Sequence, residues 1–170
     1  PSVCNALDTL LIHEKQIKKL LPKIVSELNR NNVETRLDSK LFNLVKDIGP
    51  RKLIKKATDK DWGNEFLDLI VSIKSVKSIE EAIDHIDKHS FGHTDGIISK
   101  INKNINTFAQ RVNSSAVTIN ASTRFNDGGE IGLGSVIAIC TTKVSPRGPL
   151  GLEEITTYKW LIKGNGHIRD

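Results

Sequence analysis

Cys4 is the residue whose type and position most directly suggest chemistry. Ser2 is a suitable N-cap, so the local pattern predicts Cys4 in the first turn of a helix. The free N–H groups of a first turn favour the thiolate, which is the nucleophilic form of cysteine. Asp8 follows one turn later and opposes the thiolate unless its carboxylate points away. From these residues alone an alternative stays open, because a small buried cysteine is the more common case.

A polar loop over residues 120–134 holds the second group of candidates. Arg124 carries a planar set of N–H donors that matches a carboxylate or a phosphate. The Ser, Thr and Gly residues around it offer hydroxyl groups and allow close approach of the backbone. A glycine-rich loop is by itself a weak signal, and Arg124 could equally be the partner in a structural ion pair.

Three histidines form a pattern that resembles a metal site. His85, His89 and His93 follow one another at intervals of four residues, as zinc ligands on a helix do. Phe91 and Gly92 are expected to end the helix before the third histidine, and no Cys or carboxylate completes an obvious ligand shell. We therefore expect no metal at this position.

The apolar pattern predicts the elements that must position these residues. It predicts a helix over residues 4–28, kinked or split at Pro22, and a short strand over 33–37. A nearly continuous apolar run predicts a buried strand over 67–76, and Ser78 with Glu81 predicts a capping box for the next helix. The elements expected after it are strands over 96–99, 116–120 and 136–139, a helix from Ile101 to Val112, and an edge strand over 155–162.

The alternation of strands and helices over residues 65–120 sets the fold class. It predicts an α/β domain with a mainly parallel open sheet flanked by helices. With 170 residues, of which 38% are hydrophobic and 26% charged, the chain has the composition of one globular domain. No apolar run approaches the roughly 20 residues that span a bilayer.

Charge and cysteine content narrow the function classes further. Residues 1–60 carry 13 Lys or Arg and 7 Asp or Glu. Because no aromatic residues or known binding motif accompany these charges, solvated helix faces are favoured over a nucleic-acid surface. The two cysteines are too few for a disulfide scaffold and fit a reducing compartment, and Cys140 lies in an apolar run expected in the core.

Five motifs in one order resemble the gamma-glutamyl phosphate reductase family, a branch of the aldehyde dehydrogenase superfamily also called glutamate-5-semialdehyde dehydrogenase. Together they extend over nearly the whole chain. They are Ser-Val-Cys-Asn-Ala-Leu-Asp-Thr-Leu-Leu from Ser2, Glu-Phe-Leu-Asp-Leu from Glu65, His-Thr-Asp from His93, the loop Asn120–Gly134, and Arg-Gly-Pro-Leu-Gly-Leu-Glu-Glu-Ile-Thr-Thr-Tyr-Lys-Trp from Arg147.

The resemblance implies an NADPH-dependent reduction of L-glutamyl 5-phosphate to L-glutamate 5-semialdehyde, a step of proline biosynthesis. It makes Cys4 the catalytic nucleophile, which would form a thioester as phosphate leaves. Glu65 matches a glutamate that holds the nicotinamide ribose in the superfamily, although it could be an ordinary exposed acid. Arg124 is the expected ligand of a substrate anion, with Asn120, Ser122 and Thr123 in the same pocket. No metal is implied.

The resemblance also implies an organisation. Residues 1–150 would be an aldehyde-dehydrogenase-like catalytic domain, and residues 151–170 a C-terminal segment whose strand joins a neighbouring subunit. The family is therefore expected to be a cytoplasmic homo-oligomer, with glutamate 5-kinase as a candidate pathway partner. Because most of the family's NADP-binding domain precedes the cysteine motif, we expect that domain to be absent here and the chain alone to be inactive.

Two rival functions stay open at this point. One is another enzyme of the superfamily, an oxidative or CoA-linked aldehyde dehydrogenase. The other is a non-catalytic structural or oligomerisation module that keeps the cysteine without a cofactor site. Binding of NADPH by the chain and phosphate-dependent oxidation of glutamate semialdehyde would separate these functions.

Overall fold

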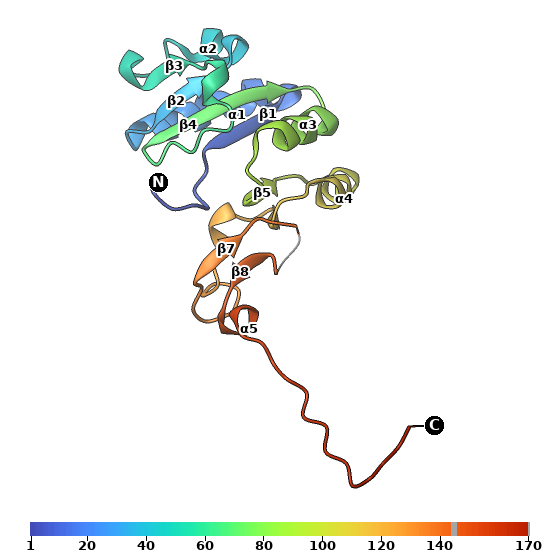
Figure 1. Ribbon diagram of the computed structural model, residues 1–170. Coiled ribbons are helices and arrows are strands. Elements are labelled where there is room, and N and C mark those ends of the chain that lie inside the picture. Colours follow the sequence, from blue (N-terminus) through green and yellow to red (C-terminus); the bar gives the residue numbers. More distant parts are fainter. Residues whose placement is uncertain (144–145, 170) are drawn as a thin grey trace.

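Four parallel strands form the main sheet of the computed structural model, which describes residues 1–143 and 146–169. Their order across the sheet is β1-β4-β2-β3 (Figure 1). The bounds are Thr9–His13 for β1, Glu34–Leu37 for β2, Ile54–Lys56 for β3 and Ile70–Val76 for β4. The α/β fold with a parallel sheet and flanking helices, expected from the sequence, is confirmed.

The helix predicted over residues 4–28 is wrong in its first part. Residues Thr9–His13 form β1, which pairs with β4 along its whole length, and the helix α1 begins only at Glu14 and ends at Arg30. A short apolar run such as Leu10–Ile12 suits a strand or a helix, and the pairing with a distant strand decides between them. Helix α1 continues through Pro22 without a break.

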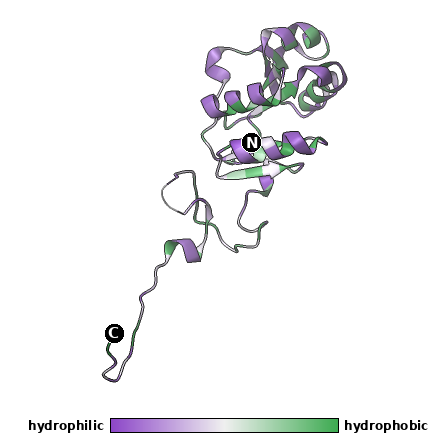
Figure 2. Ribbon diagram, turned by 90° about the vertical axis from the view of Figure 1, so that its right-hand side faces the viewer, coloured by the Kyte–Doolittle hydropathy of each residue, from purple (hydrophilic) through white to green (hydrophobic). Residues whose placement is uncertain are grey.

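The hydrophobic core lies between the main sheet and the helices α1 and α2, the latter spanning Ser39–Val45. Figure 2 shows hydrophobic residues between these helices and the strands, with hydrophilic residues on the outer helix faces. Each fully buried aliphatic side chain contributes about 1.5–3 kcal/mol. The buried core residues are Ile12, Ile17, Leu21, Val25, Leu37, Leu41, Val45, Ile54, Val71 and Ile73.

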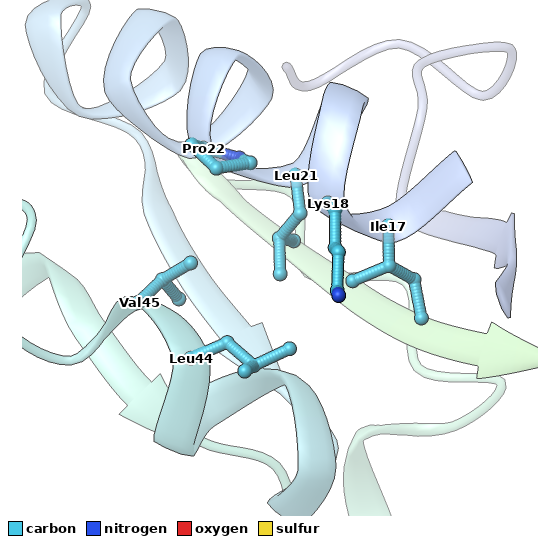
Figure 3. Close-up of a pocket in the computed structure, with 6 residues that line it drawn as sticks. All are labelled: Ile17, Lys18, Leu21, Pro22, Leu44 and Val45. Atoms are coloured by element: carbon cyan, nitrogen blue, oxygen red, sulfur yellow. The ribbon is translucent and has the colours of Figure 1, made fainter. Parts of the chain in front are cut away.

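A shallow groove of about 220 Å³ separates the outer sides of α1 and α2 (Figure 3). Leu21 and Val45, which belong to the core, also line this groove, and Leu44 borders it. The Lys18 side chain lies along it, so its aliphatic part covers apolar surface.

A smaller parallel pair, β5 (Thr94–Ile97) and β6 (Ala116–Ile119), continues the chain after the helix α3. Helix α3 spans Ile79–His89 and packs with α4, which spans Asn102–Arg111. The buried side chains of this second core are Ile83, Phe108 and Val112.

The expected capping box at α3 is half right. The Ser78 hydroxyl accepts a hydrogen bond from the Glu81 N–H at 3.2 Å, as an N-cap does. The Glu81 carboxylate accepts from the N–H of Lys77 rather than from that of Ser78. The helix start was therefore predicted correctly, but the reciprocal bond lies one residue earlier.

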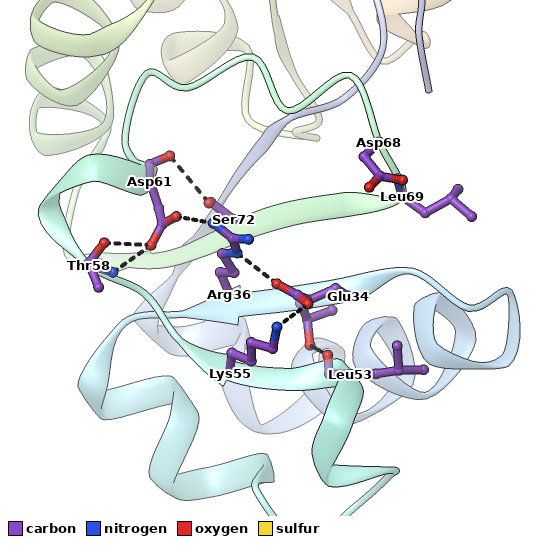
Figure 4. Close-up of polar contacts among 10 residues, drawn as sticks. Glu34, Arg36, Leu53, Lys55, Thr58, Asp61, Asp68, Leu69 and Ser72 are labelled. Carbon is purple, nitrogen blue, oxygen red and sulfur yellow. Dashed lines mark hydrogen bonds and ion pairs between the residues drawn. The ribbon is translucent and has the colours of Figure 1, made fainter.

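The sheet-edge network, which we define as Glu34, Arg36, Lys55, Thr58 and Asp61, closes one side of the main sheet (Figure 4). Arg36 pairs with Glu34 at 2.8 Å and with Asp61 at 2.5 Å, and Lys55 pairs with Glu34 at 2.6 Å. The N–H and hydroxyl of Thr58 both donate to the second oxygen of Asp61. These bonds hold the turn after β3 against strand β2.

The C-terminal part of the described chain has a small antiparallel pair and an extended tail. Strands β7 (Ala138–Cys140) and β8 (Gly148–Leu150) pair, and the short helix α5 (Leu152–Ile155) follows. Residues 156–169 then run away from the rest of the molecule (Figure 1), with Tyr158 and Trp160 79% and 82% exposed. No strand is assigned there, because an edge strand needs a partner for its backbone; its pairing in an assembly stays a prediction.

Candidate active site

Cys4 lies in a tight turn directly before β1, not in a helix. The turn is closed by a hydrogen bond of 3.0 Å from the Ala6 N–H to the Val3 carbonyl. Ser2 therefore caps no helix, and the argument that a helix N-terminus favours the thiolate was wrong. The Cys4 side chain is an exposed free thiol, so a small electrophile can reach it from solvent.

Asn5 is the buried residue of this turn and the centre of its polar contacts. Its Nδ2 donates to the carbonyl of Asn126 at 3.1 Å and to the carbonyl of Arg124 at 3.4 Å. Its Oδ1 accepts from the guanidinium of Arg124, and its own carbonyl accepts from the Thr123 hydroxyl at 2.7 Å. The turn that carries Cys4 is thus fixed to a loop almost 120 residues later in the chain.

The loop after β6 carries the four residues predicted to bind substrate. Ser122 accepts from the Arg124 N–H at 3.2 Å and so caps a 3₁₀ turn over Thr123–Phe125. Thr123 and Arg124 both contact Asn5, so the structure brings these two residues to the Cys4 turn. Asn120 instead accepts from the Ser99 N–H at 2.8 Å and holds the segment after β5.

A line of hydrogen bonds continues from Asn126 into β5. Asn126, which is 4% exposed, donates from Nδ2 to the Thr94 hydroxyl at 2.8 Å. The Thr94 oxygen lies 2.6 Å from Nδ1 of His93. The Thr94 hydroxyl can donate to His93 Nδ1 or accept from it, according to the tautomer of the ring. The Nε2 of His93 is buried, and none of the described residues forms a hydrogen bond with it.

Carboxylates surround the start of β1 and shape its electrostatics. Burial raises the pKa of Asp8, against a hydrogen bond from Thr9, and the charges of Asp95 and Glu65 add to the rise. Burial lowers the pKa of His93, which Glu65 and Asp95 oppose. Glu65 is exposed, and its charge raises the pKa of both Asp8 and His93.

The other two histidines form a separate cluster. His85 and His89 pack ring to ring with centroids 4.5 Å apart, and Trp62 meets His85 edge-on at 5.5 Å. Burial, together with the charge of Lys74, lowers the pKa of His85 to about 4. Within residues 1–143 and 146–169, no three His, Cys, Asp or Glu side chains gather as ligands of a metal ion would.

The resulting geometry suits an anionic electrophile. An exposed thiol lies one residue from the anchor of a guanidinium, and among the described residues no carboxylate forms an ion pair with Arg124. An arginine without a carboxylate partner retains its charge and spare N–H donors for a phosphate or carboxylate. We refer to Cys4, Asn5, Thr123, Arg124 and Asn126 as the Cys4–Arg124 site.

Sequence reasoning missed the two asparagines of this site. Asn5 lies in the motif around Cys4, and Asn126 lies in the polar loop, so both are close in sequence to residues that were predicted to belong to the site. Their burial was the missing information, since an asparagine in a polar stretch is usually exposed.

None of the described helices is long and apolar enough to cross a bilayer.

Comparisons with known proteins find similarity to one family along nearly the whole chain. The sequence model described as "Aldehyde dehydrogenase family" matches residues 56–138. A gamma-glutamyl phosphate reductase of Clostridium botulinum is 50% identical over 169 residues, which cover 99% of this chain and 39% of the relative. The chain spans about 40% of the length of the curated relatives it matches.

Solved structures agree with the sequence comparison. The crystal structure of a gamma-glutamyl phosphate reductase from Thermotoga maritima superposes with a TM-score of 0.90 at 45% identity, over 100% of this chain and 40% of that one. A gamma-glutamyl phosphate reductase from Saccharomyces cerevisiae gives a TM-score of 0.57 at 31% identity, over 75% of this chain and 32% of that one. Over its whole length the chain is therefore similar to one part of the gamma-glutamyl phosphate reductases, and its fold is that of the aldehyde dehydrogenases.

Proposed function

We propose that the chain supplies the thiol-bearing part of an enzyme that reduces L-glutamyl 5-phosphate to L-glutamate 5-semialdehyde. The single observation that carries this proposal is the exposed Cys4 thiol on the turn to which Asn5 anchors Arg124, an arginine that pairs with no carboxylate among the described residues. A thiol attacks an acyl carbon well, and an acyl phosphate brings the anion that an arginine binds. The names of the relatives point to the same reaction.

Cys4 would act as the nucleophile. Its thiolate forms a bond to the acyl carbon, the bond from that carbon to the phosphate oxygen breaks, and inorganic phosphate leaves with the electron pair. A thioester on Cys4 remains. After reduction of its carbonyl carbon, the C–S bond breaks, Cys4 regains its thiolate and the aldehyde leaves.

Arg124 would bind an anion of the substrate, either the phosphate or the α-carboxylate. Thr123 would fix the loop through its bond to Asn5, and Ser122 through its cap of the 3₁₀ turn. Asn120, which bonds the segment after β5, would shape the same loop from its other end. The proposed substrate-binding set is Arg124, Asn120, Ser122 and Thr123.

The similarity to aldehyde dehydrogenases and gamma-glutamyl phosphate reductases suggests a nicotinamide cofactor, and we propose that it is NADP(H). When bound, it would supply the hydride for the reduction. Glu65 is the residue of this chain that would hold it, since an exposed carboxylate can accept hydrogen bonds from the two ribose hydroxyls. The electrostatic effect of Glu65 on Asp8 and His93 supports this role.

We further propose a cytoplasmic homo-oligomer organised as residues 1–150 and a C-terminal segment 151–170. The exposed free thiol of Cys4 supports a reducing compartment. The extended tail with its exposed Tyr158 and Trp160 supports strand pairing with another subunit. Glutamate 5-kinase would be the enzyme that supplies the unstable acyl phosphate.

The test is an assay of the reverse reaction in a chimaera. The chain is joined to the part of the Clostridium botulinum relative that lies outside the matched 169 residues. We expect phosphate-dependent reduction of NADP⁺ by glutamate 5-semialdehyde, and a loss of at least about 10³-fold in kcat for Cys4→Ser. The control is Cys140→Ser, which should stay within about twofold. Activity of Cys4→Ser, or activity that needs no phosphate, would refute the proposal.

The 170-residue chain alone separates the enzymatic from the structural function. It should neither bind NADPH nor turn over substrate, while its Cys4 thiol still reacts with alkylating agents. Tight NADPH binding by the chain alone would show that its residues are sufficient for a cofactor site.

A further inference from the structure

The Arg124 guanidinium is held by an amide rather than by an acid. Its Nη1 donates to Oδ1 of Asn5, a neutral acceptor, and no carboxylate pairs with it among the described residues. A carboxylate at position 5 would hold the arginine as firmly, but it would also neutralise its charge. An amide fixes the position of the guanidinium and leaves the charge available.

The orientation of the Asn5 amide is fixed by its other contacts. Both protons of Nδ2 point to carbonyl oxygens, those of Arg124 and Asn126. A flipped amide would place oxygen against these two carbonyls and –NH₂ against the guanidinium, so Oδ1 must face Arg124. Asn126 is itself held by Thr94, so the orientation of Asn5 is supported from strand β5.

We propose that Asn5 is a positioning residue that holds Arg124 beside the Cys4 turn without neutralising its charge. Asn5 is 5% exposed and touches no substrate itself; it acts through Arg124. The ligand class is an anion that carries its charge a short distance from the carbon attacked by Cys4. This inference rests on the proposed function for its substrate, but the position and charge of Arg124 can be measured without any turnover.

The experiment compares two alkylating agents on the full 170-residue chain. Iodoacetate is an anion and iodoacetamide is neutral, while both react with the same thiolate. The ratio of their rates at Cys4 therefore reports the local charge, with Cys140 as an internal reference in the same mass-spectrometric digest. Because unfolding would also separate Arg124 from Cys4 and change the ratio, the ratio is read only for variants whose circular dichroism matches that of the unsubstituted chain.

Removing or neutralising the arginine should lower the ratio at Cys4. Arg124→Gln should lower it about threefold at low ionic strength, as Coulomb's law gives for one unit charge at roughly 7 Å in water. Asn5→Asp should lower it to the same level, because its carboxylate pairs with Arg124. In 1 M salt, where the Debye length is about 3 Å, all variants should approach one ratio.

Two further variants keep the inference falsifiable. Asn29→Asp makes the same change at another buried asparagine, which donates to Val33, and should leave the ratio unchanged. If Asn5→Asp does not fold, Asn5→Ala removes the anchor without adding charge and should lower the ratio by less than Arg124→Gln does. A wild-type ratio in Arg124→Gln, in Asn5→Asp or in Asn5→Ala would overturn the proposal.

The chimaera then distinguishes this inference from the proposed reaction. If the chimaera is active, Asn5→Asp should raise KM for phosphate or for the semialdehyde about tenfold and change kcat less. An inactive chimaera with the expected alkylation ratios would refute the reductase function and leave the role of Asn5 standing. An active chimaera with KM unchanged in Asn5→Asp would refute the role of Asn5 alone.

Discussion

Two arginines of this chain are held in opposite ways. In the sheet-edge network, Arg36 lies between the carboxylates of Glu34 and Asp61, and its guanidinium stacks 4.9 Å from the Phe66 ring centre. In the Cys4–Arg124 site, Arg124 is held by the neutral amide of Asn5. The first arginine is neutralised and serves the fold. Arg124 has no carboxylate partner among the described residues, so its charge is available to bind an anionic ligand.

The largest effect on stability is expected when the sheet-edge network is broken by Asp61→Asn. The buried Asp61 carboxylate accepts from Arg36 and twice from Thr58, and an amide cannot accept all three bonds. We expect the free energy of unfolding to fall by about 2–4 kcal/mol in urea titrations. The matched control is Asp68→Asn, which changes an exposed carboxylate just before strand β4. This control should change the free energy of unfolding by less than about 0.5 kcal/mol. Equal losses would remove the structural role from this network.

Arg124→Ala tests the other side of the comparison. The side chain is exposed, but its loss leaves Oδ1 of the buried Asn5 without a donor, so the free energy of unfolding should fall by only about 1 kcal/mol. In the active chimaera, KM for the ligand of Arg124 should rise about 10- to 100-fold, as the loss of a charge-assisted hydrogen bond predicts. A rise in KM for phosphate would assign the phosphate to Arg124, and a rise for the semialdehyde would assign the α-carboxylate. If both KM values stay unchanged, Arg124 does not bind an anion of the substrate.

The smallest effect concerns pH and two carboxylates with opposite shifts. Burial raises the pKa of Asp61, but the hydrogen bonds from Thr58 and Arg36 outweigh it and lower the pKa below its ordinary value. The stability that Asp61 contributes is therefore present above its unfolded pKa of about 3.9 and is lost as the pH falls through the folded value.

Asp8 behaves in the reverse sense, because burial raises its pKa. The folded state binds this proton more tightly than the unfolded state, so ionisation of Asp8 weakens the fold as the pH rises through its folded pKa. Asp8→Asn should thus stabilise the chain at pH 7, by less than about 1 kcal/mol, and leave its stability at pH 3 nearly unchanged. Thermal unfolding at both pH values measures the difference. A loss of stability at pH 7 would contradict this sign.

Much of the fold could be predicted from local sequence, and the errors have physical reasons. The strand Ile70–Val76 could be predicted from its nearly continuous apolar run, and the helix Ile79–His89 from its apolar period and its N-cap residue. The start of the chain was read as helix because Leu10–Ile12 lacks any local signal for its pairing with β4. Arg124 could be found from its residue type, but Asn5 could not, since its partners lie about 120 residues away.

That separation along the chain has a consequence for how the site forms during synthesis. Strand β1 pairs only with β4 within the described residues, so it has no partner until residues 70–76 have left the ribosome. The Cys4 turn must then wait until Arg124 and Asn126 emerge, which at 5–20 residues per second takes roughly another 3–10 s. Until then the turn that carries the Cys4 thiol lacks its hydrogen bonds to Arg124 and Asn126. The Cys4 turn is therefore made about 120 residues before the loop that anchors it, and the Cys4 thiol passes this interval without Arg124.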